Sequence, residues 1–116
     1  MIRAGLLLPA LFLPLAALAD TAPDYSGIYN AACTKDEAQF AITITADTID
    51  YYESTCTLSD PQALPGFADA TLYSATCTGE GQEWVKPLII MAGLDGGLVL
   101  VDDGYAATYL RCDVLE

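Results

Sequence analysis

The stretch ATCTGEGQEWVKPLIIM, residues 75–91, decides the fold of this chain. It holds Cys77, a turn between two glycines, the only tryptophan, Trp84, and the start of the apolar run Leu88–Ala92. Strand-forming segments on both sides of a glycine turn are typical of a β-hairpin. Because Trp84 begins the most apolar segment directly after the turn, we expect its ring to be a structural residue of the core.

Short segments of the same kind flank this hairpin on both sides. Asp-Gly pairs stand between the last apolar runs, at residues 95–96 and 103–104, and such pairs favour tight hairpin turns. The expected strands are residues 26–31, 39–45, 49–58, 68–78, 83–91, 98–101 and 105–112. The pattern predicts an all-β domain, a small antiparallel meander that forms a closed or nearly closed barrel of six or seven strands; a sandwich is the alternative.

Three local patterns give finer expectations. Residues 39–45 alternate, which predicts a half-buried strand with Phe40 on its apolar face. The alternation within 49–58 is untidy around the paired tyrosines, which indicates a bulge. Residues 59–66 contain two prolines and a glycine, so we expect one long loop there, the first candidate to contact a partner.

The first nineteen residues have the pattern of a secretory signal peptide. Arg3 gives a positive start, residues 6–18 are apolar but broken by prolines, and Ala17-Leu18-Ala19 is a small-x-small cleavage site. A buried N-terminal helix or a retained anchor is the alternative. We expect residues 1–19 to be removed, which leaves 20–116 as a single acidic β domain, periplasmic or secreted and not inserted in the membrane.

The remaining chain is strongly acidic. It keeps all sixteen Asp and Glu but only three cations, Lys35, Lys86 and Arg111, for a net charge of −13. Such a domain repels nucleic acid and anionic membranes and attracts a basic partner. The alternative is that the charge serves solubility alone.

Four cysteines in a small exported chain predict two disulfides. Of the three possible pairings we favour Cys33 with Cys112, which would tie both ends of the domain together, and Cys56 with Cys77, which would join neighbouring strands. The chain has no histidine and no Cys-x-x-Cys motif. Zinc sites, thioredoxin-like chemistry and histidine-dependent nucleophiles are therefore not expected.

The carboxylates do not predict an enzyme. Glu80 and Glu83 lie in or beside a turn, where solvated acids are usual, and Asp95, Asp102 and Asp103 lack the spacing of a calcium loop. We expect no catalytic residue, no metal and no cofactor.

Glu53 is the exception among the acids because it stands between tyrosines and a cysteine in an expected strand. An unpaired charge is costly there if the position is buried. Arg111, next to Cys112, is the natural partner, and we expect a structural ion pair between the two. The alternative is that both face water on the outer surface.

Three motifs carry a resemblance to known proteins. Glu53-Ser-Thr-Cys56, Cys77-Thr-Gly-Glu-Gly-Gln-Glu-Trp84 and Tyr109-Leu-Arg-Cys112 resemble the pattern of a group of small exported four-cysteine bacterial proteins, mostly uncharacterised. This resemblance implies no assigned activity. In size, export and acidity the chain is also similar, more weakly, to the periplasmic inhibitors of chicken-type lysozyme, which present side chains from a barrel face to the lysozyme cleft.

Two functions from different classes follow as hypotheses. The first is a monomeric envelope binding module for a basic protein partner, for example an inhibitor of a lysozyme-like hydrolase. The second is a structural or stress-related periplasmic protein without enzymatic activity. A barrel that stacks a small ligand on Trp84 and the tyrosines is a third possibility, limited by the small interior of a 97-residue domain.

Overall fold

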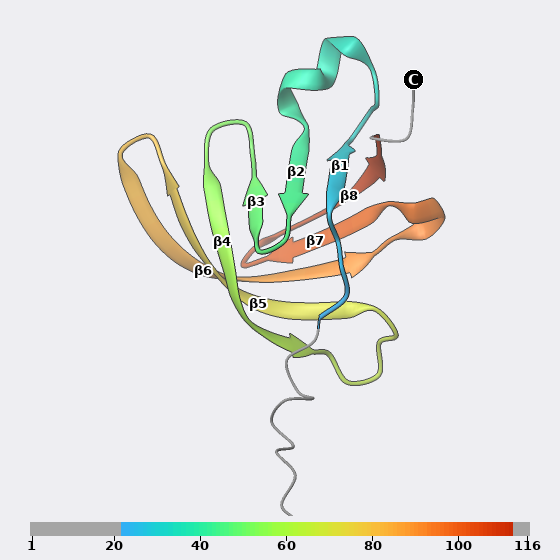
Figure 1. Ribbon diagram of the computed structural model, residues 1–116, viewed down its shortest axis with the longest axis vertical. Helices are drawn as coiled ribbons and strands as arrows, with labels where there is room; N and C mark the ends of the chain where they lie inside the picture. The colour runs from blue at the N-terminus through green and yellow to red at the C-terminus, as the bar shows by residue number, and fades with distance from the viewer. Residues whose placement is uncertain (1–21, 113–116) are drawn as a thin grey trace, which may run out of the picture.

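The computed structural model describes residues 22–112, which form a closed antiparallel barrel (Figure 1). Each strand pairs with the next one along the chain, and the last strand closes on the first. The strands are β1 (Gly27–Asn30), β2 (Ile42–Thr45), β3 (Thr48–Asp50), β4 (Thr55–Ala63), β5 (Ala70–Gly79), β6 (Gln82–Ala92), β7 (Leu98–Asp102) and β8 (Tyr105–Arg111). The all-β meander and the closed barrel are confirmed, with eight strands where six or seven were expected.

The additional strand comes from residues 49–58, which are not one strand with a bulge. They contain the end of β3, a turn at residues 51–54 and the start of β4, with Asp50 paired to Thr55. The Tyr51 amide donates a hydrogen bond of 2.8 Å to the Ser54 carbonyl oxygen and closes the turn. The untidy alternation around the tyrosines therefore marks a reversal of the chain.

Two other expectations need correction. Phe40 belongs to a 3-10 helix, η2 (Lys35–Phe40), and is 45% exposed instead of facing the core. The Asn30 side chain donates a hydrogen bond of 2.7 Å to the Glu37 carbonyl oxygen and holds η2 against β1. The expected loop at 59–66 is largely strand, because β4 continues to Ala63 through a register shift between Ser59 and Gln62.

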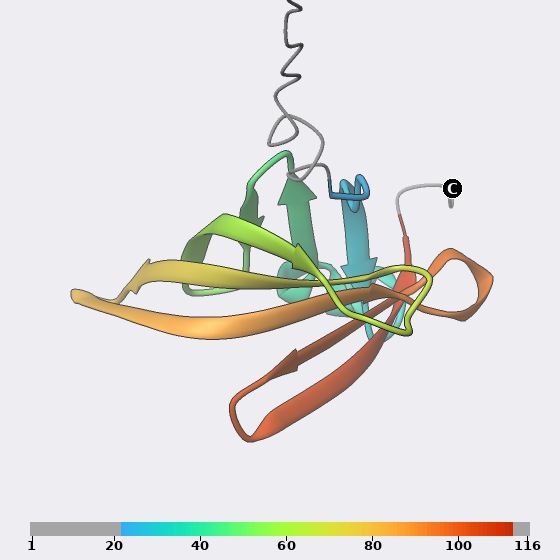
Figure 2. The same ribbon diagram turned by 90° about the horizontal axis from the view of Figure 1, so that it is seen from below.

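The central hairpin is confirmed. Gly79 pairs with Gln82, and the two residues between them, Glu80 and Gly81, have φ of 51° and 79°. Positive φ at both central residues is what the tightest hairpin turns require. Strands β5 and β6 extend well past the shorter strands β1 to β3 (Figures 1 and 2).

The interior of the barrel is apolar. Its buried side chains come from the seven strands β1 to β7 and include Ile42, Ile44, Ile49, Leu58, Leu88, Ile90, Leu98 and Leu100. Along β6 and β7 every second residue faces inward, as the strand period requires. A second short 3-10 helix, η3 (Leu94–Gly96), connects these two strands.

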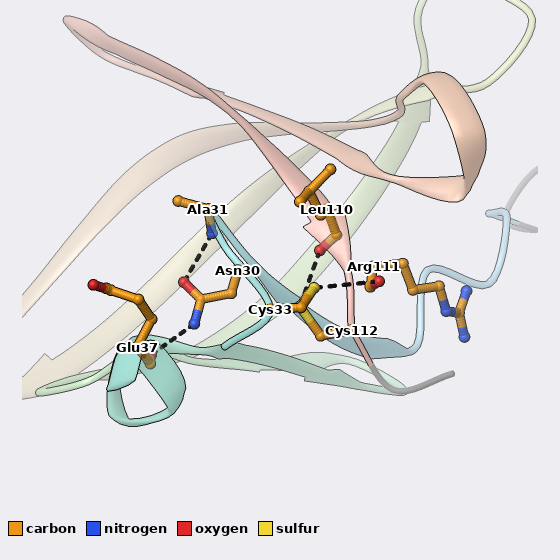
Figure 3. The surroundings of a disulfide bond; sticks show 7 residues. All are labelled: Asn30, Ala31, Cys33, Glu37, Leu110, Arg111 and Cys112. Atoms are coloured by element: carbon orange, nitrogen blue, oxygen red, sulfur yellow. Dashed lines mark hydrogen bonds between the residues drawn. A yellow bond between two sulfur atoms is a disulfide. The ribbon is translucent and has the colours of Figure 1, made fainter. Parts of the chain in front are cut away.

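Both expected disulfides are present. Cys56 and Cys77 face each other across β4 and β5 and are buried. The bridge between Cys33 and Cys112 fastens the junction of β1 with β8, which has only two paired positions (Figure 3). Two such bridges are typical of proteins that fold in an oxidising compartment.

The expected signal peptide, residues 1–19, lies outside the described residues. Within 22–112, no helix has the length and apolar character needed to cross a membrane.

Candidate binding site at the open end of the barrel

The connections of a meander alternate between the two ends of its barrel. One end, which we call the open end, carries the connections 31–41, 51–54, 80–81 and 103–104, together with Asp50, residues 82–86, Asp102, Tyr105 and Tyr109 of the adjoining strands. The other, the closed end, carries residues 22–26 and the connections 46–47, 64–69 and 93–97. The β3–β4 turn is the centre of the open end, because its three consecutive residues Tyr51, Tyr52 and Glu53 contact three different neighbours.

Tyr51 faces the interior of the barrel. Its ring lies 5.5 Å from the Lys86 Nζ, a distance at which an ammonium is attracted to an aromatic face. Burial raises the pKa of Tyr51 to about 12, and the nearby charge of Asp102 and the Tyr105 hydroxyl add to the shift. The hydroxyl group of Tyr51 is therefore neutral at physiological pH.

Tyr52 faces outward and contacts η2. Its ring centroid lies 5.1 Å from that of Phe40 in a tilted arrangement, which is favourable for an aromatic pair. Both rings remain about half exposed, at 55% and 45%. The pair is an apolar surface that water covers in the free protein.

Glu53 contacts the tip of the central hairpin. A Cβ atom on Gly79 would lie 2.5 Å from the Glu53 carbonyl oxygen, so the close approach of turn and hairpin requires glycine. The Glu53 side chain is within hydrogen-bonding reach of the Glu80 carboxyl group, and this contact, with the charge of Glu80, raises the pKa of Glu53. Two exposed carboxyl groups thus lie close together, where they repel each other once both are ionised.

A cavity of about 260 Å³ opens between β6, β7, β8 and the β3–β4 turn. Leu88 and Leu100, which belong to the buried core, provide its apolar part. We call this the mouth cavity, lined by Tyr51, Lys86, Leu88, Leu100, Asp102, Tyr105 and Tyr109.

An ion pair lies in the mouth cavity. Lys86 Nζ is 2.8 Å from Asp102 Oδ2, and the two side chains are only 24% and 17% exposed. The register explains the contact, because Leu88 pairs with Asp102 and Lys86 lies two positions before Leu88 on the same face of β6. Because the pair is partly buried, removing one member would leave the other charge unpaired, which costs more than it would on the surface.

Tyr109 completes the polar wall of the cavity. Burial raises its pKa to about 12, and a hydrogen bond with Tyr105 contributes. Tyr105 is 60% exposed at the rim. The mouth cavity therefore combines neutral phenol groups, one carboxylate and one ammonium above an apolar base.

The open end also concentrates exposed aromatic rings and acids. Among the described residues, four of the five aromatic side chains classed as exposed lie there, namely Phe40, Tyr52, Trp84 and Tyr105, while Phe67 lies at the closed end. Eight acids lie on the same segments: Asp36, Glu37, Asp50, Glu53, Glu80, Glu83, Asp102 and Asp103. The two lysines of the described chain, Lys35 and Lys86, also lie at this end. The eight acids outnumber them, so the open end has a clear excess of negative charge.

The structure does not bring Glu53 and Arg111 together, so the expected ion pair is wrong. Glu53 is exposed in a turn beside Glu80. Arg111 instead donates a hydrogen bond of 3.2 Å from Nη2 to the Ser26 carbonyl oxygen and lies 5.7 Å from the Tyr29 ring centroid. Figure 3 shows the Arg111 side chain extending away from the nearby disulfide.

Trp84 was expected to be a core residue, and this prediction is wrong. It is 38% exposed because it pairs with Cys77 near the end of the hairpin, where β5 and β6 extend beyond the short strands. Its neighbour Val85 is 67% exposed. Trp84 therefore belongs to the exposed aromatic surface of the open end.

The residues of the mouth cavity were not predicted as a site. A signal was present, because Lys86 follows the inward alternation of Leu88 and Ile90, and Asp102 follows that of Leu98 and Leu100. Two opposite charges on the inner faces of adjacent strands indicate a pair at the end of a barrel interior. Among residues 22–112, no cluster of three or more His, Cys, Asp or Glu is arranged to hold a metal ion.

Fold and site together define a small disulfide-bonded β-barrel with an acidic, aromatic open end. No family model, no curated protein sequence and no solved structure matches this chain.

Proposed function

We propose that this protein is a binding module of the cell envelope, periplasmic or secreted, whose open end binds a basic protein partner. The observation that carries the proposal is the β3–β4 turn, which gathers carboxylates and exposed aromatic rings at one end of a rigid barrel. Aromatic side chains supply contact area at an interface, and the carboxylates supply complementarity to Lys and Arg.

The proposed partner is basic because of both the overall and the local charge. The excess of acids repels nucleic acid and accelerates the approach of a cationic protein. A lysozyme-like hydrolase is our first candidate partner, in agreement with the export signal expected for residues 1–19. The barrel acts by binding, without catalysis, a cofactor or insertion in a membrane, and it does so as a monomer.

The test compares two variants that remove equal charge from opposite ends. Glu83→Gln with Asp103→Asn neutralises two exposed acids of the open end, and Asp47→Asn with Asp95→Asn neutralises two of the closed end. Binding of a chicken-type lysozyme is measured by calorimetry at low and high salt, with a basic protein of an unrelated class as control.

We expect the open-end variant to weaken lysozyme binding by about tenfold and the closed-end variant by about twofold, because only the first removes local contacts as well as net charge. Wild-type affinity should also fall at high salt. Equal losses in both variants would show that the charge acts only as a general field. If neither basic protein binds even at low salt, the structural or stress-related role gains support.

A further inference from the structure

The mouth cavity has the components of a receptor for a single cationic side chain. Lys86 Nζ contacts the Asp102 carboxylate at 2.8 Å and lies 5.5 Å from the Tyr51 ring. A carboxylate with an adjacent aromatic face is the arrangement that binds ammonium and guanidinium groups most strongly. In the free protein, this arrangement is occupied by a cation of the chain itself.

The cavity has room for a second side chain. Lys86 belongs to its wall, and about 260 Å³ remains between the lining residues. This volume is that of several waters, each of which takes about 30 Å³ in the liquid. An aliphatic stem would lie against Leu88 and Leu100, which are buried at the base.

The charged and titratable groups around the cavity favour a cation over an anion. Asp102 is the carboxylate inside it, and Tyr105 lies at the rim. Tyr51 and Tyr109 are neutral, as phenols are at physiological pH, and burial raises the pKa of each further, to about 12. The exposed acid Asp103 follows Asp102 directly. Lys86 is the single cation among the lining residues.

We propose that the mouth cavity receives one lysine or arginine side chain of the partner, and that Lys86 is an internal cation that occupies its place until the partner binds. The inference rests on the proposed function and names the subsite within it. The partner's cation takes over the contacts with Asp102 and the Tyr51 ring, while Lys86 turns outward toward the acids at the rim.

This arrangement makes Lys86 a competitor. The apparent affinity of a partner is reduced by the fraction of molecules in which its site is available. If Lys86 occupies the site about nine-tenths of the time, its removal strengthens partner binding by about tenfold. A purely structural ion pair predicts the opposite, because its loss would leave Asp102 unpaired and loosen the open end.

The test is the direction of the change in affinity for Lys86→Met, measured on the chicken-type lysozyme described above. Lys35→Met is the matched control, since it removes the same charge from the same end but outside the cavity. We expect Lys86→Met to bind about tenfold tighter and Lys35→Met to change affinity by less than about twofold. Weaker binding by Lys86→Met, or equal effects of the two variants, would overturn the inference.

A small probe separates this inference from the proposed function. N-acetyl-arginine amide is titrated into the Lys86→Met protein while the ring signals of Tyr51 and Tyr109 are followed by nuclear magnetic resonance. We expect saturable shifts at about millimolar concentration, absent when Asp102→Asn is added and weaker in the wild type. Shifts without any lysozyme binding would support the cavity and contradict the proposed partner, whereas lysozyme binding without shifts would contradict the cavity.

Correct folding of the variants is checked by near-ultraviolet circular dichroism. If Lys86→Met does not fold, Lys86→Gln keeps a polar group at the same position and removes the charge. We expect the same increase in affinity from it, and a decrease would contradict the inference equally.

Discussion

The two ends of the barrel use the same residue types, tyrosines and acids, to opposite effect. At the closed end Tyr25 and Tyr29 are 7% and 2% exposed, and their hydroxyl groups contact Thr71 Oγ1 at 3.0 Å and the Tyr25 carbonyl oxygen at 2.8 Å. At the open end Tyr52 and Tyr105 are more than half exposed. The difference arises because Ala22 and Tyr25 of the segment 22–26 pack on the core at one end, whereas helix η2 of the longest connection at the other end has no buried residue.

The closed end is also held by the strand junction. Arg111 of β8 reaches across to the Ser26 carbonyl oxygen, and its guanidinium lies near the Tyr29 ring. Gly27 has a φ of 157°, which L side chains rarely adopt, and a Cβ atom there would lie 3.1 Å from the Arg111 guanidinium, so the position favours glycine. The junction of β1 with β8 therefore links the two ends, because Arg111 contacts Ser26 of the closed end while the Cys33–Cys112 bridge ties β8 to the connection 31–41 of the open end.

The largest effect is expected from removing that bridge with Cys33→Ala and Cys112→Ala. The bridge closes a loop with a sequence separation of 79 residues, for which the chain-entropy model gives about 4.5 kcal/mol. Because the junction has only two paired positions, we expect amide exchange to increase first at residue 112, whose amide donates a hydrogen bond of 2.7 Å to the Ile28 carbonyl oxygen, before the β5–β6 hairpin is affected. Denaturant unfolding and hydrogen exchange check this, and an equal loss of protection in the β5–β6 hairpin would contradict it.

A somewhat smaller effect is expected from Tyr25→Ala, which removes the ring that covers the closed end. The buried ring packs on the core and its hydroxyl contacts Thr71, so we expect a loss of about 3 to 4 kcal/mol in the free energy of unfolding. The matched variant at the open end is Tyr105→Ala, whose side chain is 60% exposed, and there the loss should stay below about 1 kcal/mol. Similar losses in chemical denaturation would show that the two ends do not differ in stability.

Most of the fold follows from the sequence, because strand alternation and glycine turns are local signals. The eighth strand was missed since the turn from Tyr51 to Ser54 contains no glycine or proline, and its tyrosines favour strands. The disulfide pairing was predicted because one bridge would tie both ends of the domain together and the other would join neighbouring strands, and both bridges are confirmed.

The site was harder to predict than the fold. The exposure of Trp84 depends on how far the β5–β6 hairpin extends past its neighbours. Glu53 is separated from Arg111 because Glu53 lies in the β3–β4 turn beside Glu80, whereas Arg111 lies at the end of β8 beside Ser26. Both are properties of the assembled barrel that no local window contains. The small number of cations was the only reason to pair Glu53 with Arg111, and that reason led to the wrong partner.

The smallest effect concerns Glu53 and tests whether the open end keeps charges together at the expense of stability. The contact with Glu80 raises the pKa of Glu53 above its usual 4.5, so the folded state binds the proton more tightly than the unfolded state. Any stability from the protonated pair is fully present below pH 4.5 and is lost as pH rises through the raised pKa, where two carboxylates face each other.

Glu53→Gln keeps a hydrogen-bond donor and removes the titration. We therefore expect it to be at least as stable as the wild type at pH 7 and to lose that advantage near pH 4.5, as thermal unfolding at both values would measure. Asp47→Asn removes one exposed acid from the closed end and is the control for the loss of one negative charge. A constant difference between Glu53→Gln and the wild type would mean that the two carboxyl groups do not interact, and the open end would then be acidic without being strained.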